Sequence, residues 1–128
     1  MIAGKARILL MNAGLDGINS NTVFAYKIPA DVTKNTSDIQ FLFTDISEYP
    51  DAEGSNSYRA YEQHVSLKIF FPVGYNGDFS TIQNKIIKFL KTHGFRFHDS
   101  SGVVALPDTD RTSMSLQFWH YEVLEEAQ

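Results

Sequence analysis

The chain of 128 residues contains no cysteine. This absence excludes disulfide bonds, thiol nucleophiles and metal sites built from thiolates, and it fits a reducing compartment. Long apolar runs are missing as well, because the only apolar run near the N-terminus covers residues 8–11. Such a run is too short for the core of a signal peptide or for a membrane span. We therefore expect a protein that is cytosolic after synthesis and has no membrane partner.

Basic residues are also few, since 11 Lys and Arg face 15 Asp and Glu and the formal net charge is −4. A dedicated nucleic-acid binder normally displays a basic face, so this balance argues against one. The content of 43% hydrophobic and 20% charged residues is that of an ordinary globular protein. The length fits a single domain over residues 1–128, with no internal repeat and no interdomain linker in the sequence.

The clearest pattern lies in the middle of the chain. Residues 62–71 alternate apolar and polar side chains, which predicts a strand with one buried face. After a turn, apolar side chains recur at three- and four-residue steps over residues 79–90, which predicts a helix. Asp78 or Ser80 can cap its start, and Gly94 is placed to end it before a second strand. We expect this strand–helix–strand unit to form the core.

Weaker patterns complete the predicted fold. A short amphipathic helix is expected over residues 3–13, and further strands over residues 23–28, 39–46, 103–106 and 112–123. The strand at 39–46 is apolar on both faces, which places it inside the sheet. Residues 99–102 are typical of a turn. Together these elements predict an α+β fold, a mostly antiparallel β-sheet packed with two α-helices.

The connection over residues 47–61 has no periodicity, and a connection of this length is either functional or disordered. This part of the chain is the most acidic, with no basic residue before Arg59. Two interpretations stay open, an electrostatic lining for a channel or partner and an acidic loop that is merely solvated. The acidic residues concerned are Asp45, Glu48, Asp51 and Glu53.

Aromatic residues are placed where protein–protein contacts usually form. In the last predicted strand, Trp119 and Tyr121 lie on the nominally outward face, and such a face calls for cover by a helix or another chain. Tyr58 and Tyr61 lie near the acidic loop. Exposed aromatic residues are typical of interaction hot spots. Packing against a helix is the other interpretation.

Evidence for catalysis is weak in this sequence. The four histidines have no spacing that brings three or four metal ligands together, and no glycine pattern is suited to phosphate. His98, Asp108 and Asp110 are the best candidates for a small metal-dependent hydrolase. A Pro-Asp-Thr-Asp segment is more typical of a turn whose carboxylates bond to local backbone amides. We therefore predict a protein that is not an enzyme, with no catalytic, cofactor or metal site.

Several motifs resemble, in their order and spacing, a family of small tail proteins found in long-tailed bacteriophages and prophages of Gram-positive bacteria. The similarity covers roughly residues 40–121. The motifs are Ile46-Ser47-Glu48-Tyr49-Pro50, Gly54-Ser55-Asn56, Val65-x-Leu67-x-Ile69-Phe70-Phe71, Ile86-x-x-Phe89-Leu90-x-x-x-Gly94-Phe95-Arg96, Leu106-Pro107-Asp108-Thr109-Asp110 and Phe118-Trp119-His120-Tyr121.

This family is similar to the tail-terminator and tail-to-head joining proteins, in which helices flank a small α+β sheet. The resemblance implies a structural protein whose hexameric ring caps the finished tail tube and presents a docking face to the head connector. The implied partners are further copies of the chain, the tail-tube protein and the head–tail connector protein, while DNA passes without specific binding. The implied location is the host cytoplasm during assembly and then the neck end of the virion tail. Besides the hydrolase, the other alternative is a non-phage adaptor domain with the same fold.

In this interpretation the residues have two roles. The aromatic residues form contacts between subunits or with partners, and the acidic residues line or rim the channel. The first group is Tyr58, Tyr61, Trp119 and Tyr121, and the second is Asp45, Glu48, Asp51 and Glu53.

Overall fold

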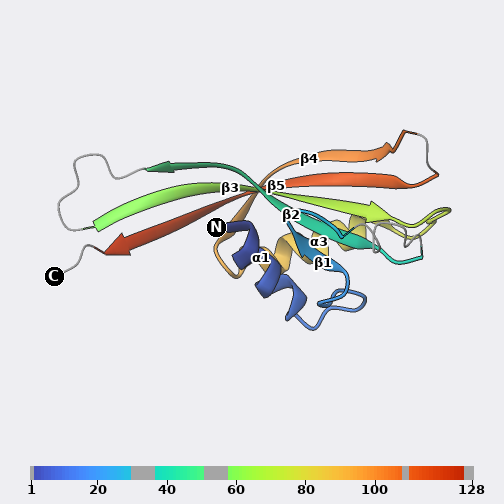
Figure 1. Ribbon diagram of the computed structural model, residues 1–128, viewed down its shortest axis with the longest axis horizontal. Coiled ribbons are helices and arrows are strands. Elements are labelled where there is room, and N and C mark those ends of the chain that lie inside the picture. The colour runs from blue at the N-terminus through green and yellow to red at the C-terminus, as the bar shows by residue number, and fades with distance from the viewer. Residues whose placement is uncertain (1, 30–36, 51–57, 108–109, 126–128) are drawn as a thin grey trace.

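A computed structural model describes residues 2–29, 37–50, 58–107 and 110–125, with the backbone alone described at 47–50, 58–61 and 122–125. Its elements form one five-stranded mixed sheet with two helices (Figure 1), which confirms the predicted α+β class. The strand order is β1-β2-β3-β5-β4, and only the β1–β2 pair is parallel among hydrogen-bonded neighbours. In chain order the elements are α1 (Ile2–Met11), β1 (Val23–Ala25), β2 (Gln40–Pro50), β3 (Tyr58–Phe71), α3 (Phe79–Lys91), β4 (Phe95–Ala105) and β5 (Thr112–Glu125).

The strand–helix–strand unit has one strand inserted into it. β3 and β4 both run antiparallel to β5, which lies between them, so β3 and β4 are parallel to each other and α3 forms the crossover. β2 lies between β1 and β3, which confirms its expected place inside the sheet.

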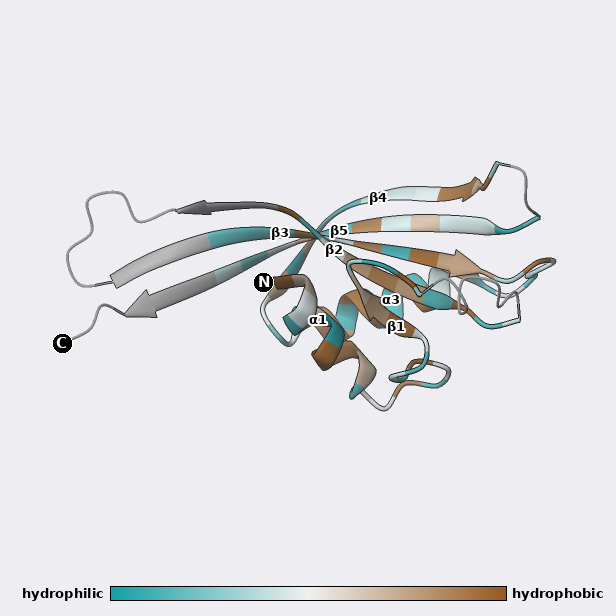
Figure 2. Cartoon of the chain, viewed as in Figure 1, coloured by the Kyte–Doolittle hydropathy of each residue, from teal (hydrophilic) through white to brown (hydrophobic). Residues whose placement is uncertain are grey.

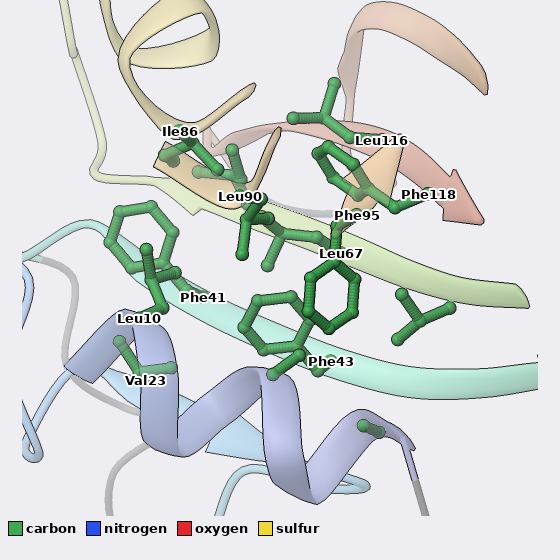
Figure 3. Close-up of a cluster of buried hydrophobic side chains, with 14 of the residues drawn as sticks. Leu10, Val23, Phe41, Phe43, Leu67, Ile86, Leu90, Phe95, Leu116 and Phe118 are labelled. Carbon is green, nitrogen blue, oxygen red and sulfur yellow. The ribbon is translucent and has the colours of Figure 1, made fainter. Parts of the chain in front are cut away.

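Both helices lie on the same side of the sheet (Figure 1), and one continuous core forms beneath them. α1 contacts β1, β2 and β3, whereas α3 contacts β4. The alternating residues of β3 face this core, because all four are fully buried, and β5 contributes a matching row (Figure 3). The β3 residues are Val65, Leu67, Ile69 and Phe71, and the β5 residues are Met114, Leu116 and Phe118.

The helix α3 begins where its sequence predicts. The Asp78 carboxylate accepts hydrogen bonds from the backbone N–H of Ser80 at 3.0 Å and of Thr81 at 3.4 Å, so Asp78 is the N-cap. At the other end, Gly94 has a φ of 87°, a conformation that glycine adopts with little strain. Ile86 and Leu90 are buried beneath the helix.

The cap at Asp78 predicts a pH dependence. The hydroxyl of Thr81 and the two backbone N–H groups lower the pKa of Asp78, so the charged carboxylate stabilises the folded state above the unfolded-state pKa. That contribution is lost as pH falls through the lowered folded-state pKa. Asp78→Asn retains a capping side chain without the charge. We therefore expect the urea midpoint of the wild type to exceed that of Asp78→Asn near pH 7, and the difference to disappear in strong acid. An unchanged difference at low pH would contradict this assignment.

Two predicted connections belong at least in part to strands. The loop expected over residues 47–61 is wrong at both ends, because β2 continues to Pro50 and β3 begins at Tyr58. Their pairing runs from Ser47 opposite His64 to Pro50 opposite Tyr61. The register shifts between Asp45 and Ser47, and a bulge of this kind interrupts the two-residue period by which a strand is recognised.

The turn expected over residues 99–102 is also wrong. β4 is one strand from Phe95 to Ala105, with register shifts between Phe97 and Asp99 and between Ser100 and Val103. Gly102 has a φ of 74° within this irregular part. The turn-like composition of this segment therefore belongs to bulges in an edge strand.

Two smaller boundaries also differ from prediction. α1 ends at Met11 instead of continuing to residue 13, and β1 ends at Ala25 instead of residue 28. Tyr26 follows with a φ of 73°, and the N–H of Lys27 bonds back to the carbonyl of Ala25 at 2.9 Å. The positive φ and this tight bond turn the chain away from β2.

Candidate functional site

The face of the sheet opposite the helices is the candidate interaction surface. Neither α1 nor α3 covers it (Figure 1). Two β5 residues three positions apart show the division, since Phe118 is fully buried in the core while Tyr121 on the other face is 48% exposed. Ile46 of β2 is also 48% exposed.

Trp119 lies on this open face between two histidines, an arrangement that we call the histidine–tryptophan stack. The ring of His64 lies 4.5 Å from that of Trp119 with an interplanar angle of 7°, and the ring of His98 lies 4.2 Å away at 23°. The three residues come from β3, β4 and β5, so the stack joins three adjacent strands. The cover that Trp119 requires is thus provided by two histidines rather than by a helix.

The bulge in β4 accounts for the position of His98. Phe97 pairs with Phe118, and Asp99 with Gln117, which leaves His98 as the extra residue between them. A bulge re-aims the side chain of its extra residue. On the other side of the stack, Nε2 of His64 lies 3.1 Å from Oε2 of Glu62.

The other two histidines have different surroundings. His120 is buried beneath the sheet, where Nδ1 lies 3.0 Å from Oε1 of Gln63 and the ring packs on Phe95. His93 lies at the end of α3 with its ring against Phe89. Among the residues that the structure describes, no group of three or more His, Asp or Glu is arranged to hold a metal ion.

The predicted contact residues Tyr58 and Tyr61 belong to β3 and not to a loop. In the register, Tyr61 is opposite Glu122 and Tyr58 is opposite Glu125, on the same strand pair that carries Trp119 and Tyr121. The structure therefore brings the backbones of all four aromatic residues onto β3 and β5. The side chains of Tyr58 and Tyr61 lie outside the described part of the chain.

These strand ends belong to a three-stranded extension, which we call the arm. It consists of residues 47–50 of β2, 58–63 of β3 and 121–125 of β5, and it projects away from the two helices, to the left in Figure 1. The last described pairing of β5 with β4 is that of Phe95 with His120, and the β5 part of the arm pairs with β3.

The predicted acidic lining is only partly described. The Asp45 carboxylate accepts a 2.8 Å hydrogen bond from the backbone N–H of Ala3 at the first turn of α1. Partial burial, together with the charge and hydrogen bond of Asp45, raises the pKa of Tyr26. Asp45 thus anchors α1 to β2. Glu48 lies in the β2 part of the arm with its side chain outside the described atoms, and Asp51 and Glu53 lie outside the described residues.

We expect Asp45→Ala to lower the free energy of unfolding by about 1–2 kcal/mol, because a helix start loses its acceptor. Asp45→Asn is the matched control and should lose less, since an amide oxygen can still accept from Ala3. Chemical denaturation of both variants measures the difference. Equal stability of Asp45→Ala and the wild type would show that this hydrogen bond does not hold α1.

The hydrolase alternative requires side chains that converge. His98 lies beside Trp119, whereas Asp110 precedes Thr112, which pairs with Ala105 at the opposite end of the β4–β5 ladder. Thr112 and Trp119 are seven positions apart on β5, a distance of about 23 Å at about 3.3 Å per residue. His98 and Asp110 therefore do not form one site. Asp108 lies outside the described residues.

One cavity was not predicted from the sequence. It has a volume of about 340 Å³ and lies where the segment after α1, the start of β2, the β3–α3 connection and α3 meet. Its lining combines apolar residues with the charged residues Asp16, Asp38 and Lys85. No pattern could have identified it, because its residues come from four separate segments. They include Asp16, Ile18, Asp38, Phe41, Tyr75 and Lys85.

No protein-family model and no curated protein sequence matches this chain. The likeness to phage tail proteins therefore depends on the motifs quoted above. Within the described residues, neither helix has the length and apolar character needed to cross a membrane.

Proposed function

We propose that this protein is a structural component of a phage or prophage tail, a terminator that forms a hexameric ring on the end of the tail tube. It joins the tube to the head connector and lets DNA pass without specific binding. It assembles in the host cytoplasm and remains at the neck end of the tail. It acts through contacts between proteins and transforms no substrate.

The observation that carries this proposal is the arm. Three paired strands extend beyond the layer of helices (Figure 1). The exposed Tyr121 and the histidine–tryptophan stack lie, by the strand register, at the start of the arm. A sheet normally buries at least one face against another layer. A second subunit can supply that layer, and aromatic residues at its margin are suited to such contacts.

A ring also requires two different surfaces on each subunit, because contacts between like surfaces close as dimers. The arm and the body are distinct surfaces of this kind. A stable contact between them should bury on the order of 800 Å² on each subunit.

Light scattering coupled to size-exclusion chromatography tests the ring. We expect a species with six times the 14.5 kDa mass of the chain, either alone or after addition of isolated tail tubes. A protein that stays monomeric at all concentrations and fails to bind tail tubes would rule the proposal out. A gene neighbourhood without tail genes would favour the adaptor alternative.

A further inference from the structure

The cavity of about 340 Å³ beside α3, which we call the α3 cavity, has the properties of a ligand-binding site. Its volume lies at the lower end of the range for small-molecule sites, about 300–1,000 Å³, and such sites combine an apolar lining with a few polar groups. Of its lining residues, Phe41 and Ile18 are buried. Asp16 and Lys85 are exposed. The cavity therefore offers apolar contacts together with charges that a ligand can reach.

The aromatic part of the lining is held in position. The backbone N–H of Tyr75 donates to the carbonyl of Pro72 at 3.1 Å. The ring of Tyr75 packs against those of Phe71 at 5.0 Å and Phe79 at 5.2 Å. A Cβ at Gly77 would overlap the Tyr75 side chain, so this side chain lies directly against the glycine backbone. Tyr75 is thus fixed before any ligand binds.

The turn after α1 is fixed as well. The N–H of Ile18 donates to the carbonyl of Leu15 at 3.1 Å, and the hydroxyl of Thr22 donates to the carbonyl of Gly17 at 3.1 Å. The carbonyl of Thr22 in turn accepts from the N–H of Phe41 at 2.8 Å, which joins this turn to β2. A site whose lining is already in place loses less conformational freedom on binding.

The lining contains one anion and one cation that are available to a ligand. Within the described part of the chain, the side chains of Asp16 and Lys85 form no hydrogen bond or ion pair, so they do not pair with each other. Asp38 adds negative charge to the lining but has an interaction of its own. A ligand that carries both an ammonium and a carboxylate group would satisfy Asp16 and Lys85 together.

The rest of the lining is suited to an aromatic group. Tyr75 and Phe41 are themselves aromatic, and aromatic rings attract one another beyond the effect of the area that they bury. Ile82 lies three residues before Lys85 in α3, so these two side chains are neighbours on the helix surface. A ligand whose charged group pairs with Lys85 can therefore place an apolar group against Ile82.

We propose that the α3 cavity binds a small zwitterion with an aromatic side chain, of the chemical class of the free aromatic amino acids. The carboxylate of the ligand pairs with Lys85, its ammonium group pairs with Asp16, and its aromatic group contacts Tyr75 and Ile82. Binding involves no covalent step. The inference goes beyond the proposed function and does not depend on the hexamer, because all the groups named belong to one chain.

Isothermal titration calorimetry with three probes tests the pairing of charges. L-Phenylalanine carries both charged groups, 2-phenylethylamine lacks the carboxylate, and 3-phenylpropionate lacks the ammonium group. We expect L-phenylalanine to bind with a Kd below about 1 mM. Each of the other probes should bind at least about fivefold more weakly, because it loses one contact with a charged group. Equal affinity for the three probes, or no binding of L-phenylalanine at about 10 mM, would overturn the inference.

Neutral variants assign the two contacts. Lys85→Met should reduce the affinity for L-phenylalanine to near that for 2-phenylethylamine, without weakening the binding of 2-phenylethylamine itself. Asp16→Asn should have the corresponding effect with 3-phenylpropionate. Both residues are exposed, so the variants should fold. Lys88→Met, on the exposed side of α3 and outside the lining, is the matched control and should bind all three probes as the wild type does. Equal losses for Lys85→Met and Lys88→Met would contradict the assigned contact.

A variant that moves the aromatic lining gives a second measurement. Gly77→Ala should displace the Tyr75 side chain and weaken the binding of all three probes, because they share the aromatic group. Gly4→Ala is the matched control, since its Cβ would have no neighbour within 4 Å, and it should bind normally. Wild-type affinities for Gly77→Ala would overturn the placement of the ligand against Tyr75. Failure of these binding tests would leave the hexamer proposal standing, because that proposal is tested by mass and by binding to tail tubes.

Discussion

Phe118→Ala should lower the free energy of unfolding by about 3–5 kcal/mol, the range for truncating a buried aromatic side chain. Phe118 is fully buried, and its ring meets that of Phe97 edge to face at 5.9 Å. It is among the core residues of β5 that lie between the sheet and the helices (Figure 3). Removal of the ring leaves a cavity that a five-stranded sheet cannot easily close.

Phe118→Leu is the matched control, because leucine retains most of the side-chain volume. It should lower the free energy of unfolding by less than half as much as Phe118→Ala. Guanidinium chloride unfolding measures both variants. A loss below about 1 kcal/mol for Phe118→Ala would mean that the core does not depend on this position.

Trp119→Ala should weaken association between subunits more than it destabilises the fold. Its side chain lies on the open face, where His64 and His98 cover both ring faces at 4.5 and 4.2 Å. Truncation of a hot-spot residue, a class enriched in Trp, costs about 2 kcal/mol or more, which corresponds to a subunit affinity about 30-fold weaker. We expect a smaller loss of unfolding free energy than for Phe118→Ala.

Trp119→Phe retains a ring between the two histidines and should keep most of the affinity. Analytical ultracentrifugation of wild type and both variants at matched concentrations measures the effect. An unchanged affinity for Trp119→Ala, with folding intact, would remove Trp119 from the predicted interface.

The parts of the fold that follow from local pattern were predictable. Val65 and Leu67 in β3 alternate with polar residues and are fully buried, and Asp78 caps α3 as its position suggests. In each case the sequence pattern that predicts the element lies within a few neighbouring residues. Burial of one face of the element is enough to produce the apolar periodicity.

The rest depends on contacts between distant segments. Bulges near Ile46 and His98 break the two-residue period, so the extents of β2, β3 and β4 were misjudged. The sequences of β1 and β2 contain no pattern that indicates their parallel pairing. Trp119 was correctly placed on the outward face, but its stacking on residues 55 and 21 positions away could not be read from its neighbours in sequence.

The strand β4 carries exposed apolar side chains. β4 is an edge strand, and the last part of it is hydrophobic in Figure 2, where Val103 and Val104 are 42% and 48% exposed. An edge of this kind invites pairing with other chains. Its two register shifts interrupt the regular backbone that such pairing needs.

The most direct test of the proposed ring is electron microscopy of tail tubes in negative stain. Tubes assembled without this protein should have open ends, and addition of the purified chain should place one ring with sixfold symmetry at one end of each tube. Tube ends that remain bare at saturating protein, or a ring that appears without this chain, would contradict the account.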